Sequence, residues 1–462
     1  MLRHDCLLSL NDLGIEKDLL QLIYNLNKEA SVVVQTPVGD TSPFITDPIV
    51  KQGSILGPVL CSTSTAEYCT ENLGVTIGTL ILASLLYVDD ILDLSSTIGD
   101  CKAAHEKAIL FAKVKKLKYS ATKCFNMILN KRAGVEHPKL QLEDGEFVIP
   151  ASVITYLGDL FNEKGNNDNL MQDRVNRGTK AMITIMAMMS ETDVGDQYIN
   201  VMLLLYRSLF LSTVLFNSQT WSKLRKKDID VLRTMQQKFL KRIIGVSSST
   251  CNASVFLELG VLPIEYEIEK RQLMYLHRIL QLPVDDPVYK MFDNMRDLND
   301  AGEQNWWTGI VRMMDKYQLD IEVIKSLSKE TFGAQVRKAV SENAFTVLYK
   351  ESKGKKKTCH LNYSKLCIQP YFTKMYPSQA RLLFKCRTRT LDIKTHVTYK
   401  YRADSVCRSC GQNDETYEHI VNCGKEPIEV LDVNNLHEMD SRVKASAQQC
   451  VGRIRDFINK YT

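Results

Sequence analysis

The hydrophobic pattern of the chain changes near Gly165, and this change limits the possible folds more than any other sequence feature. Before Gly165, short apolar runs alternate with turn residues, which is typical of β-strands and hairpins. From about residue 168 to residue 350, apolar residues recur at helical spacing and strand patterns fade. A chain that places its strands before its helices predicts an α+β fold, with an antiparallel sheet followed by a helical part.

Several elements can be placed from these patterns. Predicted in the first part are a hairpin over 31–50, strands over 79–88 and 91–94 around an Asp89-Asp90 turn, a helix over 98–118, and strands near 124–129 and 146–157. In the second part, amphipathic helices are predicted over 226–245 and 265–282. The lysine-rich stretch 350–357 is predicted to be an exposed linker.

The net charge of the chain is only +5, but it is unevenly distributed. Residues 345–402 hold 14 lysines and arginines against two acids, Glu351 and Asp392, which is a surplus of 12 positive charges. Nine aromatic residues are interleaved with these cations, including Tyr363, Tyr371, Phe372, Tyr376 and Tyr399. Each aromatic taken singly favours a place in the core, whereas the cations as a group favour a nucleic-acid partner.

The thirteen cysteines predict free thiols or metal ligands rather than a disulfide framework, because Asp5 interrupts any signal-peptide-like run. The longest uncharged stretch, 72–88, is shorter than a membrane-spanning helix. We therefore expect an intracellular protein, nuclear or cytoplasmic, without a membrane partner.

Four of the cysteine and histidine residues have metal-ligand spacing, Cys407-x2-Cys410-x8-His419-x3-Cys423. Three thiolates and one imidazole can complete a tetrahedral structural zinc site with no open position. The alternative is a chance grouping of cysteines.

Two adjacent acids, Asp89 and Asp90, end the apolar run Leu85-Leu86-Tyr87-Val88. Two neighbouring carboxylates are costly to bury, so a turn that presents them to solvent and to Mg²⁺ is favoured. The tetrapeptide alone is equally compatible with a plain hairpin turn, since Asp is common in turns.

The surrounding motifs resemble those of reverse transcriptases of the LINE-type (non-LTR) retrotransposon class. They are, in order, the Gln52-Gly53 block that continues to Pro58 and Leu60, the Tyr87-x-Asp89-Asp90 box, Lys123 in an Ala-Thr-Lys-Cys stretch, and Tyr156-Leu157-Gly158. The Cys-Cys-His-Cys element and the Arg381–Arg389 segment also resemble parts that follow the polymerase in that class. The resemblance implies a partial palm over 1–165, a helical thumb over 166–290, a helical connector over 291–350, and a basic region with a zinc knuckle over 351–462.

The resemblance also implies roles for single residues. Asp89 would bind Mg²⁺, with Asp90 supporting it, and Tyr87 would pack under the primer end. Gln52 and Gly53 would line the template and the incoming nucleotide. Lys123 would act on the pyrophosphate leaving group, although a solvated surface lysine is an equally good interpretation. RNA template, DNA primer and deoxynucleotide are the partners of the intact parent protein.

The resembling family has a further catalytic Asp upstream, just before a stretch that Arg3-His4-Asp5-Cys6-Leu7-Leu8 resembles. We do not assign its role to Asp5, which is predicted to begin a helix. We therefore expect no substantial DNA synthesis from this chain. The alternatives are a non-catalytic zinc-containing nucleic-acid-binding protein derived from a retrotransposon, and a first block lost in gene prediction. Oligomeric state is not predicted.

Overall fold

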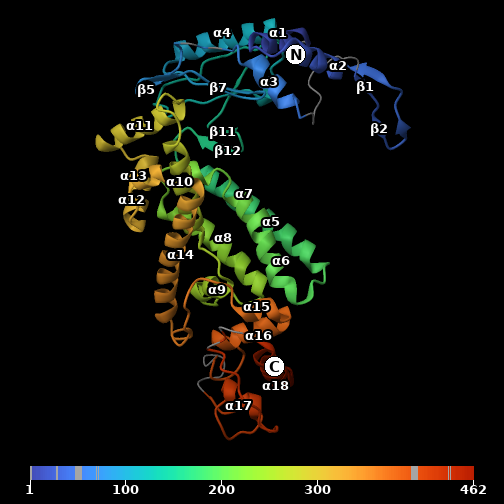
Figure 1. Ribbon diagram of the computed structural model, residues 1–462, viewed down its shortest axis with the longest axis vertical. Coiled ribbons are helices and arrows are strands. Elements are labelled where there is room, and N and C mark those ends of the chain that lie inside the picture. Colours follow the sequence, from blue (N-terminus) through green and yellow to red (C-terminus); the bar gives the residue numbers. More distant parts are fainter. Residues whose placement is uncertain are drawn as a thin grey trace. The chain divides into compact units, whose positions relative to one another are not determined.

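The structure is a computed structural model that describes residues 3–27, 30–46, 55–68, 70, 72–396, 404–434, 436 and 439–461 (Figure 1). The chain divides into two compact units. The first contains Met1–Tyr156, Phe161–Gly165 and Val284–Asn294, and the second contains Leu157–Leu160, Asn166–Pro283 and Met295–Thr462. Strands occur between Ala30 and Asn162, and helices dominate the described residues after Asn162, so the predicted α+β class is confirmed.

The first unit combines short helices with small two-stranded sheets. Its helices are α1 (Arg3–Asp12), α2 (Lys17–Asn27), α3 (Gly57–Thr65), α4 (Ile98–Val114), η1 (Ala121–Lys123) and the first part of α11 (Pro287–Asp300). The antiparallel pairs are β1 (Ala30–Val32) with β4 (Phe44–Thr46), β2 (Gln35–Thr36) with β3 (Gly39–Asp40), β5 (Val75–Ile77) with β6 (Leu80–Leu82), and β7 (Ser84–Tyr87) with β8 (Asp90–Asp93).

Two further strand pairs complete the sheets. Strand β9 (Phe125–Asn126) pairs in parallel with β10 (Ile149–Pro150), and β11 (Val153–Tyr156) is joined with β12 (Asp159–Asn162). Where one antiparallel sheet was expected, the described residues form separate pairs. The hairpin predicted over 31–50 is present up to Thr46, and residues 47–50 lie outside the described residues.

The second unit is helical. Its first helices are α5 (Asp168–Ser190), η2 (Gly195–Gln197), α6 (Tyr198–Leu205), the π-helical segment η3 (Tyr206–Leu211), α7 (Ser212–Val214), η4 (Ser218–Thr220), α8 (Lys226–Ile244), α9 (Asn252–Leu259) and α10 (Ile264–Leu280). The remaining helices are α12 (Trp306–Tyr317), α13 (Ile321–Ser326), α14 (Lys329–Lys353), α15 (Pro370–Lys374), α16 (Pro377–Arg387), α17 (Tyr417–Asn422) and α18 (Ser441–Tyr461).

Both amphipathic helices predicted in this part are confirmed as α8 and α10. The apolar face of α8 is buried as expected, and the helix ends at Gly245, whose backbone is left-handed with φ 76°. Lys241 was expected off this face, but it is also buried. Its ammonium donates to the Ser248 carbonyl at 2.6 Å, which offsets the cost of burying the charge.

A glycine in the middle of α5 allows three helices to pack closely. A Cβ atom on Gly178 would lie 2.6 Å from Val214 of α7 and 2.7 Å from Met235 of α8. These distances are shorter than any non-bonded carbon contact, so only glycine fits between the helices. The sequence pattern around Gly178 did not predict this close packing of helices.

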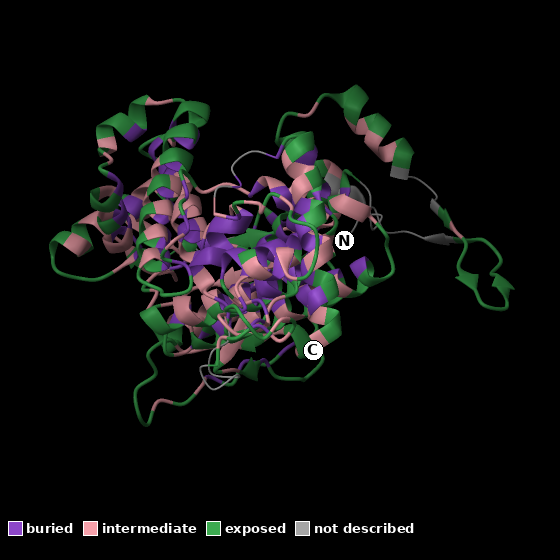
Figure 2. Ribbon diagram, turned by 90° about the horizontal axis from the view of Figure 1, so that it is seen from below, coloured by how far each residue is buried: buried purple, intermediate pink, exposed green. Residues whose placement is uncertain are grey.

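One continuous hydrophobic core runs through the second unit, from Leu170 of α5 to Phe457 of α18. Figure 2 shows its helices with buried sides and exposed opposite sides, as amphipathic helices require. The thumb and zinc-bearing regions expected over 166–290 and 351–462 both contribute to this core, whereas most buried side chains of the connector expected over 291–350, such as Trp306, Ile310 and Phe332, lie outside it. The predicted linker is shorter than expected, because α14 continues to Lys353; the lysines of the stretch are exposed except for Lys353, which is half-buried.

An ion pair in this core joins residues far apart in the sequence. The carboxylate of Glu258 on α9 accepts from Arg387 Nε at 2.8 Å, from Tyr363 at 2.7 Å and from Tyr371 at 2.8 Å. Both charged side chains are 0% exposed, and the second Arg387 donor, Nη1, bonds to the Val433 carbonyl. Arg387 belongs to the basic stretch of residues 345–402. Because its side chain is buried and paired with Glu258, this cation is structural and cannot contact nucleic acid. Tyr363, Tyr371 and Phe372 are buried, as the sequence analysis expected for each aromatic residue taken by itself. Tyr376 is exposed.

Replacing Glu258 by Gln should lower the free energy of unfolding by about 3–5 kcal/mol, because it leaves the Arg387 guanidinium buried without a counter-charge. Urea denaturation measures this loss. The matched control is Glu265→Gln, which breaks a partly exposed pair with Arg233 (2.7 Å) and should cost less than about 1 kcal/mol. Equal losses in the two variants would contradict this account.

Candidate functional site

The Asp89-Asp90 motif lies at the tip of the β7/β8 hairpin. Tyr87 pairs with Asp90 across the ladder, so Val88 and Asp89 form a two-residue turn. Val88 has a left-handed backbone with φ 57°, which is rare for a β-branched residue. Both aspartates and Tyr87 are exposed, with 59% of the Tyr87 side chain accessible. The carboxylates therefore carry no burial cost and are open to a cation or a ligand.

Helix α3 packs against this turn. Cys61 Sγ donates to the Val88 carbonyl at 3.4 Å, and Thr65 Oγ1, one helical turn later, lies 3.4 Å from the same oxygen, although its single hydrogen has a nearer acceptor in the Cys61 carbonyl at 3.1 Å. These contacts hold the strained residue from one side. Helix α3 contains the end of the sequence block that starts with Gln52 and Gly53. The packing of α3 therefore places that end of the block next to the aspartates. Gln52 and Gly53 themselves lie outside the described residues.

A polar network supports the base of the hairpin. Asp93 accepts from Ser84 and from Tyr68, both at 2.7 Å, and Thr70 is hydrogen-bonded to Ser84. Burial raises the pKa of Asp93, and the hydrogen bonds from Ser84 and Tyr68 oppose this shift. Asp93 is thus occupied in fixing the two strands. The sequence analysis did not single out these supporting residues, because a Tyr and a Ser distant in sequence carry no motif.

Tyr156, the first residue of the Tyr-Leu-Gly motif, lies near the aspartates. Burial raises its pKa, and the negative charge of Asp90 raises it further. The next two residues, Leu157 and Gly158, are both left-handed, with φ 47° and φ 83°, as a two-residue type I′ turn requires. This explains the glycine, whereas Leu157 is held in a conformation that is unfavourable for it.

Lys123 ends the short helix η1 and is exposed. No hydrogen bond or ion pair of its ammonium is found within the described part of the chain. The exposed position is compatible with either interpretation of this residue. Among the described residues, Asp89 and Asp90 are not joined by a third acid, since the Cys/His cluster near the C-terminus is the one group of three or more potential metal ligands found there.

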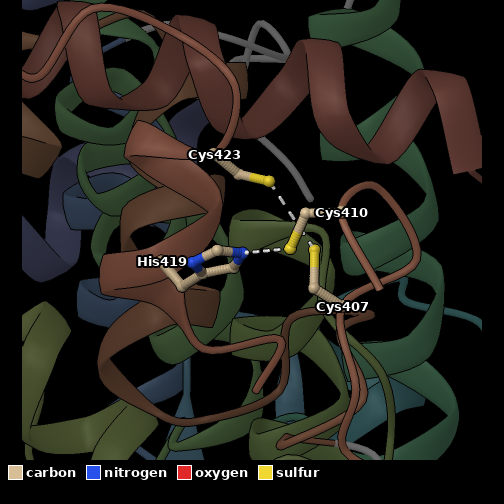
Figure 3. A group of neighbouring side chains, drawn as sticks. All are labelled: Cys407, Cys410, His419 and Cys423. Atoms are coloured by element: carbon tan, nitrogen blue, oxygen red, sulfur yellow. Dashed lines mark hydrogen bonds between the residues drawn. The ribbon is translucent and has the colours of Figure 1, made fainter. Parts of the chain in front are cut away.

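That cluster consists of Cys407, Cys410, His419 and Cys423, as the spacing predicted (Figure 3). The four ligand atoms lie within 4.8 Å of one another. The sulfurs of Cys407 and Cys423 are 3.9 Å apart, and Cys410 Sγ is 3.3 Å from His419 Nε2. A zinc–sulfur bond of about 2.3 Å implies a tetrahedral edge of about 3.8 Å. The cluster could therefore bind a metal ion such as zinc with little rearrangement.

Backbone hydrogen bonds shape the two halves of the cluster. Cys407 N donates to the Asn413 carbonyl at 2.7 Å, and Gly411, left-handed with φ 66°, donates back to the Cys407 carbonyl at 2.9 Å. The second half lies on α17, where Thr416 caps the helix by accepting from His419 N at 3.2 Å. Helix α17 places His419 and Cys423 one turn apart, on the side that faces the Cys407–Cys410 turn (Figure 3).

The thiols differ in acidity. Backbone N–H groups of Asn413 and Gln412 lower the pKa of Cys410 to about 6, whereas burial raises the pKa of Cys423 to about 11. A bound cation would favour both thiolates, so metal binding would release protons and weaken in acid.

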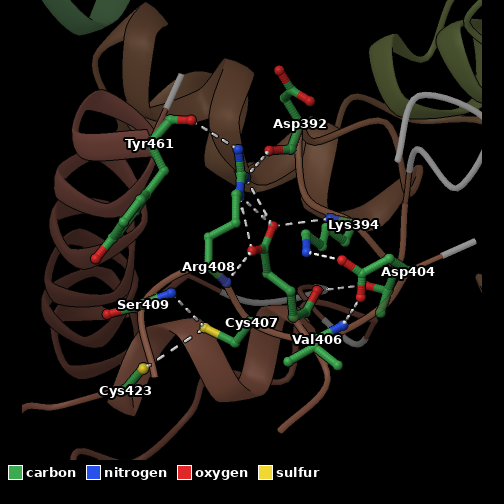
Figure 4. Close-up of polar contacts among 11 residues, drawn as sticks. Asp392, Lys394, Asp404, Val406, Cys407, Arg408, Ser409, Cys423 and Tyr461 are labelled. Atoms are coloured by element: carbon green, nitrogen blue, oxygen red, sulfur yellow. Dashed lines mark hydrogen bonds and ion pairs between the residues drawn. The ribbon is translucent and has the colours of Figure 1, made fainter. Parts of the chain in front are cut away.

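A charged network ties the cluster to the rest of the second unit (Figure 4). Arg408, between the first two ligands, bonds to the buried carboxylate of Glu415 at 2.8 Å, to the Tyr461 carbonyl at 2.9 Å and to the Asp392 carbonyl at 3.1 Å. Its guanidinium also lies 5.6 Å from the ring centre of Phe457 on α18. Arg408 therefore fixes the turn that carries Cys407 and Cys410.

Not all cations of the basic stretch are free for a ligand. Besides Arg387, Arg381 donates to the Ile244 carbonyl at 2.9 Å, Lys374 donates to the Met439 carbonyl at 2.8 Å, and Lys394 is paired with Asp404. The expectation that these charges act as one nucleic-acid-binding group must therefore be narrowed to the remaining exposed cations.

No protein-family model matches the chain, and no curated protein matches it. None of the described helices has both the length and the apolar character needed to cross a membrane.

The purified protein should contain one zinc ion, released by a thiol-modifying reagent and measured with a colorimetric chelator. Cys410→Ser should abolish stoichiometric zinc, because it removes one of four ligands. Cys359→Ser, which changes an exposed thiol outside the cluster, should leave the zinc content unchanged. Wild-type protein without bound zinc, even after refolding in its presence, would rule the site out.

Proposed function

We propose that this chain is the palm and the following helical part of an RNA-directed DNA polymerase of the LINE-type retrotransposon class. The observation that carries the proposal is the exposed Asp89-Asp90 turn, which is held by the helix that follows the Gln52 block. The contacts of Cys61 and Thr65 with the Val88 carbonyl support a turn whose conformation is held by α3. The negative charge of Asp90 raises the pKa of Tyr156, which supports a place for the Tyr-Leu-Gly motif in the same region.

In this proposal, the exposed carboxylate of Asp89 binds magnesium and Asp90 supports it. Tyr87, exposed beside them, packs under the primer end, and Gln52 and Gly53 line the template and incoming nucleotide. Lys123 assists the departing pyrophosphate. Magnesium, when bound, would supply Lewis-acid activation of the primer 3′-hydroxyl and stabilise charge on the leaving group. The residues 1–165 would be the palm, and the helices from α5 onward the thumb and connector.

One carboxylate pair on a single turn is not enough for this chemistry. Two magnesium ions about 4 Å apart need acidic ligands on both sides. No third acid joins Asp89 and Asp90 within the described ranges. We infer that a polypeptide of these 462 residues has negligible polymerase activity.

The second candidate is a non-catalytic, zinc-containing nucleic-acid-binding protein of retrotransposon origin. The closed Cys₃His cluster favours it, because all four positions are protein ligands and none is open for catalysis. In this alternative zinc is structural, and the exposed cations near it bind the RNA or DNA backbone.

Primer extension on a primed RNA with Mg²⁺ and deoxynucleotides should give no product above that of Asp89→Ala, because no third acid joins Asp89 and Asp90 among the residues that the structure describes. Product that the wild type forms and Asp89→Ala does not would contradict the inferred inactivity. It would also show that Asp89 is catalytic.

Photo-crosslinking tests where the primer end binds, and it does not depend on catalytic activity. A primer with a photoreactive 3′-terminal base, annealed to RNA, should crosslink to the peptide that contains Tyr87, because the proposal places the primer end there. Asp89→Ala with Asp90→Ala should reduce this crosslink severalfold, since the Mg²⁺ that positions the primer end is lost. Asp144→Ala, in another exposed turn, should not. Crosslinks confined to the second unit would replace this proposal by the second candidate.

A further inference from the structure

Three segments of the second unit bring basic side chains together. These are the turn after α14 with Lys357 and His360, the end of α16 with Arg389, and the turn before the undescribed residues with His396. The first two segments are tied directly, because His360 Nε2 lies 2.9 Å from the Arg387 carbonyl oxygen. We call Lys357, His360, Arg389 and His396 the cation cluster.

The two imidazoles of the cluster have unused nitrogens. A carbonyl oxygen only accepts hydrogen bonds, so His360 Nε2 must carry its proton and Nδ1 is left over. The Nδ1 atoms of both His360 and His396 are buried and have no hydrogen-bond partner among the described residues. Buried polar atoms without partners are uncommon and indicate a missing ligand, ion or water.

The surroundings of these nitrogens are positive. Burial, together with the positive charges of Arg389, Lys357 and His360, lowers the pKa of His396 to about 3. Burial and Arg389 likewise lower the pKa of His360, with smaller effects from Arg387 and Lys353. No acid contributes to either shift. The charged ends of Lys357 and Arg389 form no ion pair with any residue that the structure describes, and both residues are exposed.

We propose that the cation cluster binds a phosphate group of a nucleic-acid strand. A phosphate offers several acceptor oxygens to the forked guanidinium of Arg389, to Lys357, and to both Nδ1 atoms once the rings are protonated. The exposed Lys355 and Lys356 beside the cluster extend the positive surface for neighbouring phosphates. The inference rests on the proposal that the chain binds nucleic acid, but not on the carboxylate turn or on polymerase activity.

The backbone at Arg389 allows a sharp test. Arg389 is left-handed, with φ 48°, at the position after α16 where glycine is preferred, and Thr390 N bonds back to the Lys385 carbonyl at 2.9 Å. Arg389→Gly therefore removes the cation without straining the fold. Lys116 occupies the same backbone position after α4 in the first unit, with φ 50°. Lys116→Gly is the matched control, with the same loss of charge and the same relief of backbone strain.

Affinity for a short single-stranded RNA is measured by fluorescence anisotropy at several salt concentrations. Arg389→Gly should weaken binding roughly tenfold and lower the salt slope by about 0.7, the value for one lost phosphate contact on a single strand. Lys116→Gly should change neither quantity. Unchanged affinity and slope in Arg389→Gly, with melting temperature and zinc content as in the wild type, would overturn the proposal.

The histidines give the cluster a pH signature. Phosphate binding favours protonated rings, and the pKa values of both rings lie below the ordinary value, so wild-type affinity should rise as the pH falls below about 6.5, and His396→Gln should reduce this rise. A pH-independent wild type would overturn the role of the histidines. Binding of inorganic phosphate at millimolar concentration, without measurable binding of RNA, would show that the cluster is a site for free phosphate. That result would overturn the nucleic-acid assignment. Loss of the primer crosslink at the Asp89 turn, with this signature intact, would count against the polymerase proposal alone.

The lowered pKa of His396 also affects the stability of the fold. Because the folded pKa of His396 lies below the ordinary value of about 6.5, the unfolded chain binds more protons in acid. The contribution of neutral His396 is complete above about pH 6.5 and is lost as the pH falls toward about 3. As the pH falls, the melting temperature of His396→Gln should therefore decrease less steeply than that of the wild type. Bound RNA should raise the melting temperature of the wild type in acid. An identical acid profile in both proteins would contradict burial of a neutral ring.

Discussion

The buried carboxylate of Glu258 organises the second unit. It faces the guanidinium of Arg387 and two tyrosine hydroxyls, and none of these four groups could remain in an apolar core alone. Because α9 and α16 are far apart in the sequence, their pairing closes a long loop and brings the basic stretch back onto the helical core. The position of the chain beyond Arg387 depends on this contact.

From that anchor, the chain passes through the cation cluster to the Cys/His cluster. Arg387 sets the carbonyl that holds His360, and Arg389 lies two residues later. Arg408 then connects the Cys407–Cys410 turn to Glu415 and to the end of α18. A metal bound at the Cys/His cluster would thus stiffen the part of the second unit next in sequence to the proposed phosphate site.

The first unit concentrates its backbone strain beside its acids. Val88, which directly precedes Asp89, has a left-handed backbone with φ 57°. Such positions persist only where surrounding contacts hold them, and here α3 supplies a hydrogen bond to the Val88 carbonyl. The strain aims the carboxylates outward from a hairpin whose base is fixed by Asp93.

Sequence patterns determined the features that depend on local order. The periodicity of α8 and α10, the β7/β8 hairpin and the spacing of Cys407, Cys410, His419 and Cys423 were readable because each is set by neighbours within a few turns of the chain. Tertiary structure alone decided which cations are free. Arg387 and Arg389 look alike in the sequence, yet Arg387 is buried against Glu258, whereas Arg389 is exposed near two imidazoles whose Nδ1 atoms have no hydrogen-bond partner among the described residues. That difference arises from contacts between distant segments, where burial and partner, rather than residue type, fix what a charge can do.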